Sequence, residues 1–61
     1  MKYTIEIECD NAAFDDQPAQ EVARILRHVA ERCDNYLHSL PEFNLYDING
    51  NHVGQAKVTG E

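Results

Sequence analysis

The stretch DINGNHVG, residues 47–54, lies between two apolar segments and decides how the chain reverses direction. Asp47 can accept hydrogen bonds from the backbone ahead of it, Asn49 suits the third turn position, and Gly50 can supply the left-handed residue of a three-residue hairpin loop. A calcium loop needs more oxygen ligands and a distant bidentate carboxylate, yet the next acid after Asp47 is Glu61. We therefore predict a hairpin turn here and no calcium site.

The hairpin is expected over about residues 42–58, with Asp47 opposite Asn51. This register places Tyr46 across from His52 and Leu45 across from Val53. The helix-facing residues are then Phe43, Leu45 and Val53, and the outward residues are Tyr46 and His52. A shift by one residue would reverse the faces, and the buried set would become Tyr46, Ile48, Ala56 and Val58. We prefer the first register.

Upstream, residues 18–40 have the spacing of a long amphipathic helix, with apolar residues at three- and four-residue steps. Pro18 suits the first helical position, and Asp15 or Asp16 could cap the helix or favour its dipole. Pro41 is expected to end the helix. The apolar stripe consists of Val22, Ile25, Leu26, Val29, Ala30, Cys33, Leu37 and Leu40.

Residues 2–9, KYTIEIEC, alternate strictly between apolar and polar side chains, which predicts a half-buried strand. One side carries Tyr3, Ile5, Ile7 and Cys9, and the other carries Lys2, Thr4, Glu6 and Glu8. Phe14, in the following loop, is expected to fold back onto the end of the core.

Together these elements predict one α+β domain over residues 1–61, with the order β-α-β-β. A three-stranded antiparallel sheet, with the last strand in the centre, would be covered on one face by the long helix. The alternative is a parallel pairing of the first two strands through a right-handed crossover.

The composition bounds the choice of partners. The 61 residues include 11 acidic and five basic side chains, giving a formal net charge of −6. This charge opposes direct binding to nucleic acid or an anionic membrane and favours a basic protein surface. No apolar run approaches the roughly 20 residues of a membrane span. Without a secretory leader, Cys9 and Cys33 are predicted to be reduced, buried thiols in a cytoplasm.

No set of side chains has the spacing of a catalytic or metal site. His28, His38 and His52 lie outside any Cys-x-x-Cys or His-x-x-x-His motif, and Cys33 lies on the other side of the helix from His28 and His38. No glycine-rich turn leads into the helix to hold a phosphate. We therefore predict neither an enzyme nor a metal or cofactor site.

An acidic face is the remaining candidate for a binding site. It would carry Glu6 and Glu8 from the first strand together with Asp10, Asp15 and Asp16 from the loop. If Tyr46 and His52 point outward, they would add an aromatic contact. Such a row of acids either keeps a small protein soluble or imitates the phosphates that a basic groove holds.

Three segments, NAAFDD, EVARILRHVAER and DINGNHVG, together resemble a pattern in small proteins of phages, prophages and plasmids. The resemblance extends from Asn11 to Gly54. Proteins of this kind include anti-CRISPR inhibitors, which bind nucleic-acid-handling surfaces of host defence complexes. The resemblance thus implies an inhibitor in the bacterial cytoplasm, whose partner is a basic surface of a host protein or ribonucleoprotein complex. The alternative is a phage assembly accessory that forms a homodimer through a sheet or helix edge.

Overall fold

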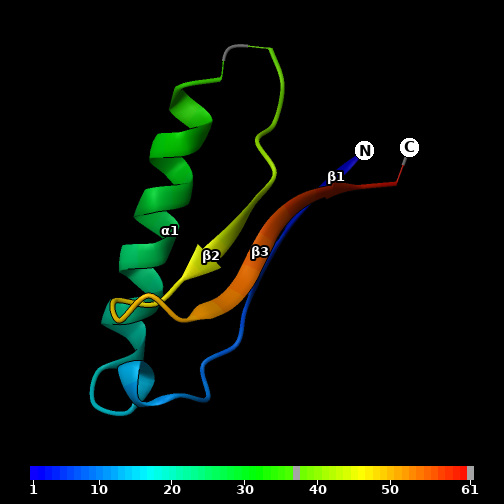
Figure 1. Ribbon diagram of the computed structural model, residues 1–61. Helices are drawn as coiled ribbons and strands as arrows, with labels where there is room; N and C mark the ends of the chain where they lie inside the picture. Colours follow the sequence, from blue (N-terminus) through cyan, green and yellow to red (C-terminus); the bar gives the residue numbers. More distant parts are fainter. Residues whose placement is uncertain (37, 61) are drawn as a thin grey trace.

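The computed structural model describes residues 1–36 and 38–60, and Figure 1 shows the element order that the sequence predicts. Strand β1 spans Lys2–Ile7, the 3-10 helix η1 spans Ala12–Phe14, and helix α1 spans Pro18–Asp34. The hairpin consists of β2, Phe43–Tyr46, and β3, His52–Thr59. No helix of the described chain is long and apolar enough to cross a membrane.

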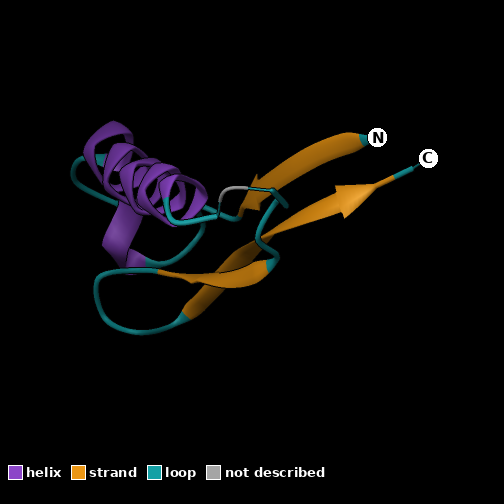
Figure 2. Cartoon of the chain, turned by 90° about the horizontal axis from the view of Figure 1, so that it is seen from above, coloured by secondary structure: helices purple, strands orange, loops and turns teal. Residues whose placement is uncertain are grey.

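The sheet is antiparallel with the order β1-β3-β2, so the last strand is central, as predicted, and the parallel alternative is wrong. Helix α1 covers one face of the sheet (Figure 2); we call the opposite face the outer face. Ile25 and Val29 of the helix pack with Phe14, Leu45 and Val53 in the core. Phe14 is only 3% exposed, which confirms its predicted role at the end of the core.

Helix α1 ends at Asp34 and not near Leu40, so the predicted helix was too long. Asp34 and Asn35 are weak helix formers, and a carboxylate at a helix C-terminus opposes the helix dipole. The N–H groups of Asn35 and Tyr36 bond carbonyls three residues back and tighten the last turn. Of the predicted stripe, Leu26, Ala30 and Leu40 are exposed, and Leu37 lies outside the described residues.

Strand β1 also ends earlier than predicted. It stops at Ile7 and not at Cys9, although the Glu8 N–H still donates to the Val53 carbonyl at 2.7 Å. Cys9 is exposed, which corrects its predicted burial, whereas Cys33 is half-buried against the core. The chain leaves the sheet at this point because it must turn back to form η1.

The hairpin loop follows the prediction. The Asp47 N–H donates to the Asn51 carbonyl at 2.9 Å, and the Gly50 N–H donates to the Asp47 carbonyl at 3.0 Å. Gly50 has a φ of 86°, the left-handed conformation that this loop requires. Tyr46 pairs with His52, as predicted.

A β-bulge then changes the register, so the predicted pairing of Leu45 with Val53 is wrong. Leu45 pairs with Gly54, and Val53 is the extra residue of the bulge. Leu45 and Val53 are nevertheless both buried, as the preferred register predicted. Ala56 is also buried, at 1% exposed, although only the shifted register predicted its burial. The bulge thus lets β3 bury Val53 and Ala56 on the same side of the sheet.

Candidate functional site

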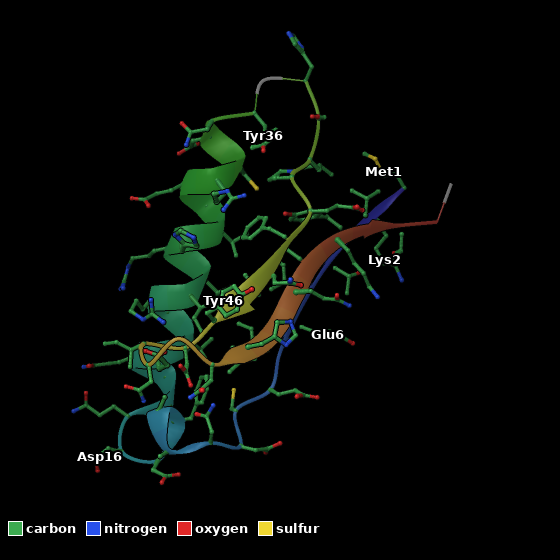
Figure 3. All side chains as sticks on the ribbon, viewed as in Figure 1. Met1, Lys2, Glu6, Asp16, Tyr36 and Tyr46 are labelled. Atoms are coloured by element: carbon green, nitrogen blue, oxygen red, sulfur yellow. The ribbon has the colours of Figure 1, made fainter. Side chains whose placement is uncertain are left out.

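All seven predicted site residues are exposed, but the structure divides the five acids into two groups. Glu6 belongs to the outer face, because it alternates with the inward Ile5 and Ile7, and the exposed Glu8 follows directly after β1. Asp10, Asp15 and Asp16 follow in the loop around η1. In Figure 3, Asp16 lies beside the start of α1, far from Glu6 across the sheet. Asp16 is therefore not part of one continuous acidic face with Glu6.

Neither Asp15 nor Asp16 caps the helix. The N-cap of α1 is Gln17, which makes no side-chain capping bond, and Asp15 instead ends η1. The expected capping role of these two aspartates is thus corrected. Their carboxylates remain exposed at the helix end of the molecule.

Tyr46 and His52 form an exposed aromatic pair on the outer face. They lie opposite each other on β2 and β3, with ring centroids 5.8 Å apart and an edge-to-face angle of 74°. Tyr46 is 49% exposed. An amphipathic ring held by a neighbouring ring is a good contact for a protein partner, because little conformational freedom is lost on binding.

The ladder brings the first acid group to the same face as this aromatic pair. Glu6 pairs with Gln55, which in turn pairs with Asn44 of β2. The Glu8 N–H bonds to Val53, the residue after His52, so the exposed Glu8 lies beside the hairpin end of β3. We define the outer-face patch as Glu6, Glu8, Asn44, Tyr46, His52 and Gln55.

Charge is segregated along the outer face. Glu6 and Glu8 lie toward the hairpin, whereas Lys2 and Lys57 lie toward the chain termini. Among the described residues the ion pair that forms is Arg24 with Glu21, so Glu6 and Glu8 are uncompensated there. Glu21 and Arg24, three positions apart on α1, make contacts of 2.8 and 3.0 Å.

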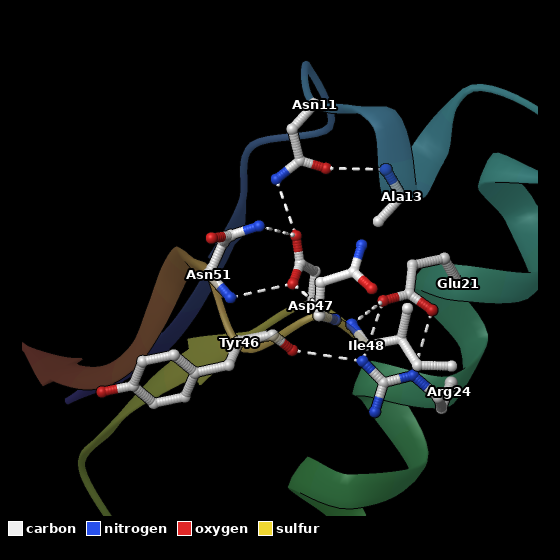
Figure 4. Close-up of polar contacts among 9 residues, drawn as sticks. Asn11, Ala13, Glu21, Arg24, Tyr46, Asp47, Ile48 and Asn51 are labelled. Carbon is white, nitrogen blue, oxygen red and sulfur yellow. Dashed lines mark hydrogen bonds and ion pairs between the residues drawn. The ribbon is translucent and has the colours of Figure 1, made fainter.

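A second group of polar residues was not predicted as a unit, and we call it the polar junction (Figure 4). The Asp47 carboxylate, in the hairpin loop, accepts hydrogen bonds from the N–H groups of Asn49 and Asn51 and from the side-chain amides of Asn11 and Asn51, at 2.8 to 3.1 Å. The Glu21 carboxylate accepts from the Ile48 N–H at 2.9 Å. The junction consists of Asn11, Glu21, Arg24, Asp47, Ile48, Asn49 and Asn51.

The polar junction joins residues of the three segments NAAFDD, EVARILRHVAER and DINGNHVG. Asn11 opens the first segment, Glu21 and Arg24 lie in the second, and Asp47 opens the third. The signal in the sequence was the presence of short polar side chains in each segment, but their partners lie up to 36 positions apart. In this chain the polar junction therefore connects η1, α1 and the hairpin, and it lies apart from the outer-face patch.

Burial and hydrogen bonding set the charge state of the junction. Burial raises the pKa of Asp47, but hydrogen bonds from Asn51, Asn49 and Asn11 outweigh it and hold the pKa below its ordinary value. The hydrogen bond from Arg24 is the main cause that lowers the pKa of Glu21. Because nitrogen donors occupy the Asp47 carboxylate, the turn makes a poor calcium ligand.

Acid is expected to destabilise the fold through these two carboxylates. A lowered pKa in the folded state contributes stability above the ordinary carboxyl pKa, near pH 4, and this stability is lost as the pH falls through the folded value. The melting temperature should fall as the pH is lowered from about 7 to about 3. This fall should be smaller in Glu21→Gln than in the unchanged protein. The exposed carboxylate variant Glu31→Gln is the control, and equal pH slopes in both variants would contradict the assignment.

Two open hollows lie outside the outer-face patch. One, of about 760 Å³, is next to the start of α1 and is lined by residues that include Asp16, Gln20, Arg24, Arg27 and Ile48. The other, of about 730 Å³, is lined by residues that include Met1, Tyr36, Leu40, Pro41 and Val58. Among the described residues no group of three or more His, Cys, Asp or Glu side chains could hold a metal ion.

Comparison with protein-family models, with curated proteins and with solved structures finds no match to this chain.

Proposed function

We propose that this chain is a non-enzymatic inhibitor from a mobile genetic element, of the anti-CRISPR kind. It would act in the cytoplasm of a bacterial host by occupying a basic surface of a nucleic-acid-handling defence complex. The observation that carries the proposal is the outer-face patch, where uncompensated Glu6 shares a sheet face with the exposed Tyr46–His52 pair and the exposed Glu8 lies beside the hairpin end of β3. The resemblance to small phage proteins supports the class of partner.

The patch has two parts with different physical roles. Exposed carboxylates on a chain of net charge −6 speed the encounter with a basic partner and orient it. Tyr46 offers contact area that charge alone does not supply, and His52 holds its ring edge-on. A rigid strand backbone presents both parts, so little ordering is required on binding.

Reversal of the two patch acids is expected to abolish partner capture. Tagged protein should retain a host nucleic-acid-binding complex from lysate at low salt and lose it at high salt, because exposed charges are screened. Glu6→Lys combined with Glu8→Lys should weaken capture by about tenfold or more. Mass spectrometry and quantitative pull-down give the partner and the retained fraction.

The matched control reverses two exposed acids elsewhere. Glu31→Lys combined with Asp34→Lys, on α1, changes the net charge equally. A second pair of variants tests the aromatic part: Tyr46→Ala should weaken capture, whereas Tyr36→Ala should not, although the two tyrosines are 49% and 46% exposed. If a patch variant and its control lose the same amount of partner capture, while circular dichroism shows that both are folded, the patch assignment is refuted.

A further inference from the structure

Strand β1 is an edge strand whose outward backbone groups have free hydrogen-bonding capacity. The Glu8 N–H donates to Val53 of β3, and by alternation Lys2, Thr4 and Glu6 also direct their backbone groups toward β3. The N–H and carbonyl groups of the intervening residues therefore face away from the sheet, toward the free edge. These residues are Tyr3, Ile5 and Ile7.

The two sides of the sheet are protected unequally. On the β2 side, Arg24 Nη2 donates to the Tyr46 carbonyl at 3.2 Å. Beyond the end of β2, Glu42 Oε2 accepts from the Val58 N–H at 2.8 Å. On the outward-facing backbone groups of β1, the one hydrogen bond among the described residues is from Cys9 Sγ to the Ile7 carbonyl, at 3.7 Å. An unprotected strand of six residues is a template for pairing with another strand.

The charge pattern of β1 is complementary to itself in the antiparallel direction. Lys2 begins the strand and Glu6 lies near its end, both on the outer face, and Glu8 follows directly after the strand. Two copies related by a two-fold axis would set the basic end of each strand beside the acidic end of the other. Side chains stay on matching faces only if the axis passes through a residue and not between two residues.

We propose that two copies of this chain pair through β1, with the two-fold axis at Ile5, to form a continuous six-stranded sheet. In this register Lys2 lies opposite Glu8, and Tyr3 lies opposite Ile7. Every edge-facing residue then exchanges hydrogen bonds with the other copy, about six in total. An axis at Thr4 would instead place Lys2 opposite Glu6 and require Met1 for the outer bonds.

The apolar side of the strand supports the same axis. Ile5 lies on the helix-covered side of the sheet but is 37% exposed, because β1 borders the uncovered edge. Pairing at Ile5 sets this side chain beside its copy and removes apolar surface from water. A domain of 61 residues gains from such burial because its own core is small.

Sedimentation velocity of the purified protein up to about 100 μM tests the proposal by mass action. We expect a dimer, and either Lys2→Glu or Glu8→Lys alone should weaken its association about tenfold or more. The double variant, Lys2→Glu with Glu8→Lys, should restore the dimer because it recreates both opposite-charge pairs. Lys57→Glu, on the central strand of the same face, is the charge control and should dimerise normally.

A monomer at every concentration would overturn the proposal. Failure of the double variant to recover, while each single variant stays folded, would overturn the register. If Glu6→Lys, and not Glu8→Lys, restores the dimer of the Lys2→Glu variant, the proposed axis at Ile5 is wrong and the axis lies at Thr4. The purified protein is measured alone, so these results do not depend on whether the chain inhibits a host complex.

Discussion

Replacing Gly54 by alanine is expected to unfold a large fraction of the protein. A β-carbon at this position would overlap the Glu6 carbonyl oxygen and lie 3.1 Å from the Ile7 α-carbon. Both atoms belong to the backbone of β1, so a side-chain rotation cannot relieve the clash. We expect a loss of about 3 kcal/mol or more, from a domain whose free energy of unfolding is only about 3 to 9 kcal/mol.

Urea denaturation followed by circular dichroism measures this effect, with Gly50→Ala as the matched control. Gly50 has open space around its α-carbon but a φ of 86°, so alanine there should cost about 1 to 2 kcal/mol of backbone strain. The comparison separates steric contact from backbone conformation. A Gly54→Ala protein as stable as Gly50→Ala would contradict the close approach of β1 and β3.

Removing the Asp47 carboxylate is expected to give the next largest loss. Asp47 is 4% exposed, and its side chain accepts from two backbone N–H groups and two side-chain amides. Asp47→Ala leaves those donors without their acceptor in a partly buried site. The melting temperature should fall by more than about 10 °C, measured by thermal circular dichroism at neutral pH.

Asp47→Asn separates the two halves of this carboxylate. Oδ1 accepts from the backbone of Asn49 and Asn51, and an asparagine oxygen can still do so. Oδ2 accepts from the side chains of Asn11 and Asn51, where an amide nitrogen would face other donors. We therefore expect an intermediate melting temperature, and equal losses for both substitutions would contradict this division of roles.

Local patterns determined most of the fold. Apolar residues alternate in residues 2–7 and recur every three or four positions from Val22 to Cys33. Each pattern places the apolar side chains on one side of its strand or helix, because backbone geometry alone fixes these periods. The turn chemistry of Asp47 and Gly50 likewise depends on neighbouring residues. Element order and the central position of β3 followed from these signals and are confirmed.

The candidate site was less predictable than the fold. Outward positions of Glu6, Tyr46 and His52 followed from alternation, and the structure confirms their exposure. The sequence did not predict that Asp16 lies far from Glu6. The path of the loop between them depends on η1 and on Phe14, which packs into the core. The polar junction was missed for the same reason, since Asn11 and Asp47 meet only once three elements have packed.

The sequence by itself thus determined the order of the elements, the apolar side of each strand and of α1, and the loop that reverses the chain. Only the tertiary structure decided where α1 ends, which residue of β3 forms the bulge, and that position 54 requires glycine. Periodicity and turn formation are local, because neighbouring residues share one backbone. The bulge and the close approach of Gly54 to Glu6 arise between strands far apart in the chain, where packing against the core selects the register.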